Sequence, residues 1–225
     1  MSTQEPGQAV DVKMPPPPPQ RTAVTVGDRG LRIQSLDELA RVSAMVKASG
    51  FAPKDFDTPE KVGTAILYAM ELGLNPITAL GQIAVVNGRP TLWGQAPLAL
   101  VRASGLLKSC NEFFVDGAGN RVASAGIASA MKKGELTAVC RVWRVGEEEP
   151  TEAFFSVADA QRAGLWGKQG PWAQYPTDML GYKARARALR GTFADVLRGV
   201  AIKEDLEGHG PVDVPAYGPL KGNSA

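Results

Sequence analysis

Residues 170–190 read GPWAQYPTDMLGYKARARALR, an aromatic and proline-punctuated loop that leads into a run of helical periodicity. Helical side chains advance by about 100° per residue. Met179, Tyr182, Ala186 and Leu189 therefore fall on one apolar face. The segment predicts a long helix that packs this face against the body of the protein.

A second stripe on this helix carries Lys183, Arg187 and Arg190, about a quarter turn from the apolar face. The nearest acids in sequence are Asp178 and Asp195, so we expect no carboxylate to face these cations. We expect their charged heads to project into an open groove. Cations at this spacing repel one another unless an anion lies beside them, and a polyanion with regular phosphates fits best. A solvated basic face is the alternative.

The positive charge of the chain is concentrated around this helix. The whole chain has a net charge of only +2, whereas residues 160–203 carry eight Lys/Arg and two acids. A local field of this kind attracts an anion to one region of the surface. Trp166, Trp172, Tyr175 and Tyr182 lie in or beside the same region. Cations interleaved with aromatic rings are typical of proteins that bind single-stranded nucleic acid. The alternative is that these aromatic residues belong to the core, which we favour for Tyr182.

A second candidate surface lies on the predicted strand at 136–145. Its alternation places Leu136, Ala138 and Cys140 on one face and Arg141 with Trp143 on the other. Arg141 and Trp143 form either part of a stacking wall or an ordinary solvent-facing cation–π pair.

Several classes of function lack their motifs. The sequence has no Walker-type phosphate loop, no dinucleotide fingerprint and no Cys/His metal spacing, so we expect no cofactor, no metal and no catalytic residue. No apolar run is long enough to span a membrane. Cys110 and Cys140 are expected to be free thiols, and the only histidine, His209, lies in a tail-like segment.

The punctuation of the chain predicts an α+β fold in which antiparallel hairpins and a small sheet pack with helices. Helices are expected to start at Ser35, Thr58, Pro97 and Ser156. Hairpins are expected around Asn87-Gly88 and residues 146–150, and further strands at 111–116 and 121–129. We expect residues 1–30, with Pro15–Pro19, to be a disordered arm, 31–206 to be one core domain, and 207–225 to be a disordered tail.

Three blocks of the sequence resemble the phage RecT/Red-beta family of single-strand annealing proteins. The blocks are LGLNP with GQIAVVNGRPTLWG (72–76 and 81–94), CRVWRVGEEEPTEAFF (140–155), and residues 170–190 followed by IKEDLEG (202–208). They occur in the family order over residues 35–207, and the GPW…P…ML…KA…R string is the most specific part.

The resemblance implies that the protein binds and anneals single-stranded DNA without ATP, as an oligomeric ring or filament and without a covalent catalytic step. It places contacts with the DNA backbone at Lys183 and Arg190, and Trp172 matches the family's tryptophan in the loop before this helix. Thr177 and Ala79 stand where some relatives carry basic residues, which shifts the load to other cations. The full set of candidate DNA-binding residues is Arg89, Arg141, Trp143, Lys168, Trp172, Tyr175, Lys183, Arg185, Arg187 and Arg190.

The expected partners are single-stranded DNA, the annealed duplex intermediate and further copies of the chain. By analogy alone, the resemblance adds a phage exonuclease and the host single-strand-binding protein, in the cytoplasm of the bacterial host if the chain is phage-encoded. Two other functions stay open, a nucleic-acid phosphodiesterase and a self-assembling viral structural protein.

Overall fold

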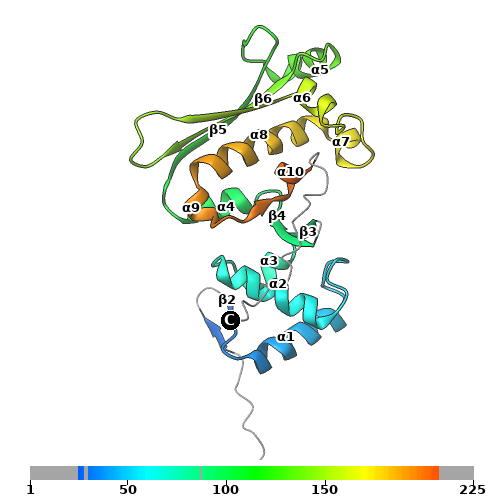
Figure 1. The fold of residues 1–225 in the computed structure, drawn as a ribbon, viewed down its shortest axis with the longest axis vertical. Coiled ribbons are helices and arrows are strands. Elements are labelled where there is room, and N and C mark those ends of the chain that lie inside the picture. Colours follow the sequence, from blue (N-terminus) through cyan, green and yellow to red (C-terminus); the bar gives the residue numbers. More distant parts are fainter. Residues whose placement is uncertain (1–24, 28–29, 87, 208–225) are drawn as a thin grey trace, which may run out of the picture.

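The computed structural model describes residues 25–27, 30–86 and 88–207, which form two lobes joined by a short segment. The N-terminal lobe is drawn below the C-terminal lobe in Figure 1, and α10 lies between them. The elements of the N-terminal lobe are β1 (Thr25–Gly27), β2 (Gly30–Arg32), α1 (Leu36–Ala48), α2 (Pro59–Glu71), α3 (Pro76–Leu80), β3 (Ile83–Val86), β4 (Arg89–Leu92) and, from much later in the chain, β8 (Ala201–Ile202).

The C-terminal lobe is a three-stranded antiparallel sheet, in the order β5-β6-β7, packed against the long helix α8. Its elements are β5 (Leu107–Val115), α5 (Ser124–Lys132), β6 (Thr137–Arg144), β7 (Thr151–Ser156), α6 (Val157–Arg162), α7 (Pro171–Gln174), α8 (Pro176–Thr192) and α9 (Ala194–Leu197). Helix α4 (Ala96–Ala103) connects the lobes, and α10 (Lys203–Leu206) follows β8. This α+β architecture confirms the predicted fold class.

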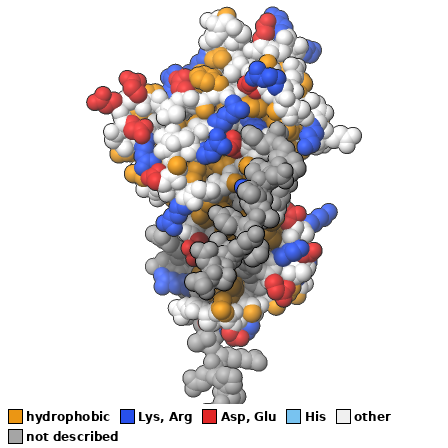
Figure 2. Space-filling model, in the orientation of Figure 1, with side chains coloured by type: hydrophobic (Ala, Val, Ile, Leu, Met, Phe, Trp, Pro, Cys, Tyr) orange, Lys and Arg blue, Asp and Glu red, His pale blue; other side chains and the backbone are white. Residues whose placement is uncertain are grey.

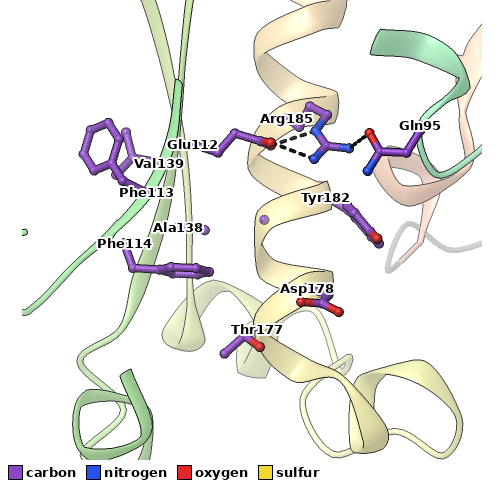
Figure 3. Close-up of a pocket in the computed structure, with 11 residues that line it drawn as sticks. Gln95, Glu112, Phe113, Phe114, Ala138, Val139, Thr177, Asp178, Tyr182 and Arg185 are labelled. Atoms are coloured by element: carbon purple, nitrogen blue, oxygen red, sulfur yellow. Dashed lines mark hydrogen bonds and ion pairs between the residues drawn. The ribbon is translucent and has the colours of Figure 1, made fainter. Parts of the chain in front are cut away.

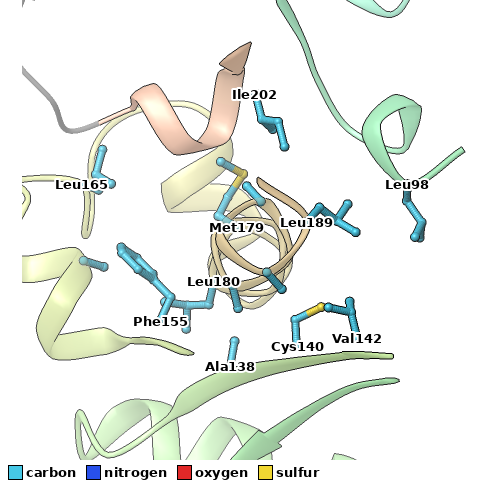
Figure 4. Packing of buried hydrophobic residues seen from close by; sticks show 14 of the residues in the cluster. Leu98, Ala138, Cys140, Val142, Phe155, Leu165, Met179, Leu180, Leu189 and Ile202 are labelled. Carbon is cyan, nitrogen blue, oxygen red and sulfur yellow. The ribbon is translucent and has the colours of Figure 1, made fainter. Parts of the chain in front are cut away.

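Each lobe has its own hydrophobic core. In the C-terminal lobe, Ala138, Cys140 and Val142 of β6 face Leu180 and Leu189 of α8 (Figure 4). In the N-terminal lobe, α1 and α2 pack together over α3 and β3. Leu100 of α4 packs against both cores. The two cores thus meet at this connecting helix, and again where Ile202 of the C-terminal core pairs with Leu92 of the N-terminal core.

The predicted helix starts of the N-terminal lobe are confirmed by their caps. The Ser35 hydroxyl accepts a hydrogen bond from the Glu38 N–H at 3.2 Å, and the Thr58 hydroxyl accepts one from the Lys61 N–H at 3.3 Å. Pro59 occupies the first turn of α2, where its missing N–H costs nothing. The cap at Ser156 is a reciprocal box with Asp159.

The two predicted hairpins also form. β3 pairs with β4 in an antiparallel register from Ile83↔Leu92 to Val86↔Arg89. Gly88 in this turn has φ of 75°, a conformation that favours glycine. Asn87 lies outside the described residues. β6 and β7 pair from Thr137↔Ser156 to Val142↔Thr151, which fixes the predicted alternation of β6.

Two expectations for the fold are wrong, and one strand was not predicted. Residues 121–129 were expected to be a strand, whereas 124–132 form α5. Ile127, Ala130 and Met131, at helical spacing, pack against the core, and this period was hidden among small residues. Residues 25–27 form β1 inside the arm that was expected to be disordered to residue 30. The strand that was not predicted is β8, which pairs with β4 in parallel and adds a third strand to the predicted hairpin.

The remaining expectations concern the ends of the chain and the cysteines. Pro15–Pro19 and the tail beyond Glu207 lie outside the described residues. Cys110 and Cys140 are free thiols, with their Sγ atoms 3.9 Å apart. Among the helices that the structure describes, none has the length and apolar character needed to cross a bilayer.

The close approach of α1 and α2 depends on Gly63, where a Cβ would lie 3.1 Å from the Ser43 Oγ. We expect Gly63→Val to lower the unfolding free energy by about 1–3 kcal/mol through overpacking, measured by urea denaturation. Gly181→Ala in α8 is the matched control, because a Cβ there meets nothing within 4 Å. It should be neutral or stabilise by up to about 1 kcal/mol. Equal destabilisation by both variants would contradict the packing argument.

Candidate nucleic-acid interface

Helix α8 is covered on more than one side, which determines which of its cations are buried and which are exposed. One side packs on β6 and β7 and another meets α10 and α4. Only a narrow strip of the helix therefore stays in contact with solvent, and its cations divide between buried and exposed positions.

Lys183 lies on the buried side of this division. Its side chain is only 2% exposed, and its Nζ donates hydrogen bonds to the carbonyl oxygens of Asp205, at 3.2 Å, and Glu207. The ring of Phe155 lies 5.5 Å from the same atom. Burial lowers the pKa of Lys183 to about 8, against the opposing effect of the nearby acids. The expectation that Lys183 projects into an open groove is wrong, because α10 covers it.

Arg190 is exposed but paired. Its guanidinium contacts the carboxylate of Asp205, whose side chain is only 6% exposed, while the Arg190 side chain is 60% exposed. The expectation that no carboxylate faces the stripe is therefore wrong. Asp205 is fifteen residues away in sequence, and it reaches α8 because the chain turns back after α9. The guanidinium has five N–H donors, so it can contact a phosphate and Asp205 together.

Arg187 is the exposed cation of the stripe that has no acidic partner among the described residues. Its Nη1 donates to the carbonyl oxygen of Phe154 at 3.0 Å, and its guanidinium lies 4.7 Å from the Phe155 ring centre. These contacts hold the charge at the rim of a surface cavity of about 280 Å³. Arg162, which pairs with Asp159, lies on the same cavity.

Arg185 points away from the stripe and into the protein (Figure 3). Its guanidinium donates two hydrogen bonds of 2.7 Å to the carboxylate of Glu112 and one of 2.9 Å to the Gln95 side chain. It lines a separate pocket of about 300 Å³ between α8 and β5. Arg185 thus joins α8, β5 and the start of α4, and the structure gives it an acidic partner instead of a free charge.

The aromatic candidates also divide between buried and exposed positions. Trp172 is only 4% exposed, its Nε1 donates to the Glu207 carboxylate at 3.1 Å, and its ring packs at a tilt on Phe155. The expectation that Trp172 presents a free stacking face is wrong, because it belongs to the core. Tyr175, by contrast, is 60% exposed at the start of α8. Lys168 in the preceding loop is also exposed.

The remaining candidates are not brought to this helix. Arg141 and Trp143 lie on the face of β6 that points away from α8, where Arg141 pairs with Glu152 and Lys108 lies 4.9 Å from the Trp143 ring centre. Arg89 is exposed at the start of β4 in the N-terminal lobe.

The sequence interpretation missed the part played by residues 203–207. The Glu204 Oε1 accepts a hydrogen bond from the Gly94 N–H at 2.7 Å, and burial raises the pKa of this carboxyl. Asp205 and Glu207 hold Lys183, Arg190 and Trp172, as described above. The signal was present in the acidic run of IKEDLEG, but nothing in the sequence indicated that it folds back on α8.

Exposed cations and acids both occur on this side of the molecule. Figure 2 shows several Lys and Arg side chains on the C-terminal lobe, with Asp and Glu side chains among them and at one edge. Within the described residues, no group of three or more His, Cys, Asp or Glu side chains could hold a metal ion. His209 lies outside those residues.

Comparison with protein families decides the class of protein. Residues 38–214 match the family model described as RecT family, which covers most of the chain. The chain belongs to the RecT family. This membership supports a role in DNA recombination through single-strand annealing. Among curated proteins, none matches this RecT-family chain with significance.

The ion pair between the buried Arg185 and Glu112 gives a stability prediction. We expect Arg185→Ala to lower the unfolding free energy by about 2–3 kcal/mol, because it leaves Glu112 without its partner. The cost stays below that of a fully buried pair, since the Glu112 side chain is 34% exposed. Arg187→Ala is the control, expected to change stability by less than about 0.5 kcal/mol. Equal urea midpoints for the two variants would contradict the assignment.

The lowered pKa of Lys183 gives a pH prediction. Between pH 8 and the unfolded value of about 10.4, the folded chain releases a proton that the unfolded chain keeps, so stability rises with pH. We expect Lys183→Met to lose this rise. Urea denaturation from pH 7 to 10 gives the unfolding free energy of both proteins. The difference between them at each pH isolates the effect of Lys183, because the other titrating groups are common to both. Parallel stability curves would show that the Lys183 amine is not buried as the structure has it.

Proposed function

We propose that this protein binds single-stranded DNA and anneals complementary strands without ATP, as an oligomeric ring or filament. The observation that carries the proposal is the RecT-family match over residues 38–214. The exposed cations on α8 support its placement on this helix.

The proposed contact residues are the cations and the ring that solvent can reach. Arg187 and Arg190 are held in place by Phe154 and Asp205, so their charged heads lose little freedom when a phosphate arrives. Lys168 and Tyr175 extend this surface through the loop that precedes α8. Cations that follow the backbone and a ring for a base are the components of a single-strand site.

Lys183, Arg185 and Trp172 are proposed to act by position instead of contact. Lys183 and Trp172 fix residues 205–207, and Arg185 fixes α8 against β5. In this proposal their replacement weakens DNA binding by disturbing the surface that Arg187 and Arg190 form. Arg89 stays a prediction. Arg141 and Trp143 are proposed to be ordinary solvent-facing residues of β6, the alternative to a stacking wall, and to lie outside the DNA surface.

Annealing by such a surface requires no covalent step. A strand held through its phosphates on neighbouring subunits keeps its bases accessible, so a second strand can test pairing at low cost. The energy comes from base pairing, which is consistent with the absence of a Walker-type loop from the sequence.

A fluorescence-quench assay tests the function. Complementary oligonucleotides carrying a fluorophore and a quencher are mixed with the protein in the absence of nucleoside triphosphates, and we expect annealing to be faster than without protein. Strand cleavage in the presence of a divalent metal would instead identify a phosphodiesterase. Oligomers that form without DNA and leave annealing unchanged would identify a structural protein.

A double variant tests the placement. We expect Arg187→Gln with Arg190→Gln to weaken binding to single-stranded DNA by about tenfold or more and to reduce the slope of log K against log salt by about 1.4. Glutamine keeps a donor for the buried Asp205, so the fold is preserved. Lys132→Gln with Lys133→Gln at the end of α5 is the charge-matched control. Filter binding from 50 to 300 mM salt measures both, and equal slopes for the two double variants would contradict the placement.

A further inference from the structure

The end of β4 presents a tryptophan that the core leaves outside. Trp93 is 44% exposed, although its neighbour Leu92 and the nearby Ala96 are almost completely buried. Its backbone is fixed, since its N–H donates to the Gln82 carbonyl oxygen at 3.2 Å. The main chain thus places the ring at the surface, where it offers an apolar face to a ligand.

A lysine from the segment between the lobes lies against this ring. The Lys203 Nζ is 5.5 Å from the centre of the Trp93 ring. This distance is near the outer limit of about 6 Å for a cation–π contact, so little is lost when the amine turns to another anion. Within the described part of the chain, no ion pair holds Lys203.

The acids next to Lys203 form no ion pair with it. The Glu204 Oε1 accepts the Gly94 N–H while its Oε2 is buried, and the Asp205 carboxylate pairs with Arg190. The positive charge of Lys203 is therefore left available at the surface. One side of α10 meets α8 through Asp205, and the other meets the end of β4 through Lys203 and Glu204.

We propose that Trp93 and Lys203 form a nucleotide-binding contact on the N-terminal lobe, in which the indole stacks on a base and the ammonium binds the adjacent phosphate of single-stranded DNA. This inference rests on the proposed function and extends its surface. Arg187 and Arg190 contact the strand on α8, and α10 leads from there to Trp93. The strand thus crosses from one lobe to the other.

The structure contains a matched control for this contact. Trp143 on the outer face of β6 also has a lysine over its ring, Lys108 at 4.9 Å. The two pairs share their chemistry, but only Trp93 adjoins α10. A surface cation–π pair without a ligand would behave in the same way at both positions.

The experiment compares Trp93→Leu with Trp143→Leu in binding to oligo(dT), by fluorescence anisotropy at fixed salt. We expect Trp93→Leu to weaken binding by about 5- to 160-fold, the range for one stacked base, and Trp143→Leu to change it less than twofold. Trp93→Phe keeps a ring and should retain most of the affinity. Equal affinity of Trp93→Leu and the wild type would overturn the inference, as would a loss confined to Trp143→Leu.

Two further measurements do not depend on the stability of the leucine variant. Binding of oligo(dT) should quench the tryptophan fluorescence of the wild type and of Trp143→Phe, but much less that of Trp93→Phe. Lys203→Ala should reduce the salt slope by about 0.7. Unchanged quenching in Trp93→Phe and an unchanged slope in Lys203→Ala would overturn the inference while leaving the proposed function intact. If the wild type binds no single-stranded DNA, the proposed function itself fails.

Discussion

The contact between Lys183 and the carbonyl oxygens of residues 205 and 207 is the constraint on which the arrangement of the two lobes depends. It fixes α10 on the helix that organises the C-terminal core. The same short segment reaches the N-terminal lobe through Glu204 and through the pairing of β8 with β4. A buried ammonium with backbone acceptors is costly to leave unpaired, so this contact determines where the segment lies.

This constraint divides the cations of α8 by function. Charges that a helical wheel places on one stripe have different surroundings once α10 covers part of it. Lys183 is buried and stabilises the fold, whereas Arg187 is exposed to solvent and is available to a ligand. Arg190 does both, since it holds Asp205 and remains exposed. A stripe of like charges therefore combines a structural anchor with a binding surface.

Local signals in the sequence predicted local structure well. The caps at Ser35 and Thr58 and the turn before Arg89 depend on neighbouring residues, and they form as expected. A strand was expected at 121–129, whereas residues 124–132 form a helix. The helix was missed because small side chains mask its apolar spacing. Such errors arise where composition is uninformative.

The candidate site was less predictable, because it depends on residues that are distant in sequence. The family resemblance and the basic character of 160–203 could be read directly. The partners of Arg185 and Arg190 could not, since Glu112 and Asp205 approach only through the tertiary fold. Trp93 had no signal of its own, because its exposure beside a buried Leu92 is visible only in the structure.

The parallel pairing of β8 with β4 also has a consequence for how the chain acquires its structure. Thr91 and Leu92 find their partners at Ala201 and Ile202, with the whole C-terminal lobe intervening in sequence. Contacts between such distant segments form late, because the loop between them must close first. On the ribosome, the sheet of the N-terminal lobe stays incomplete until the C-terminal lobe has been synthesised, and its open edge at β4 is exposed to other strands throughout that interval.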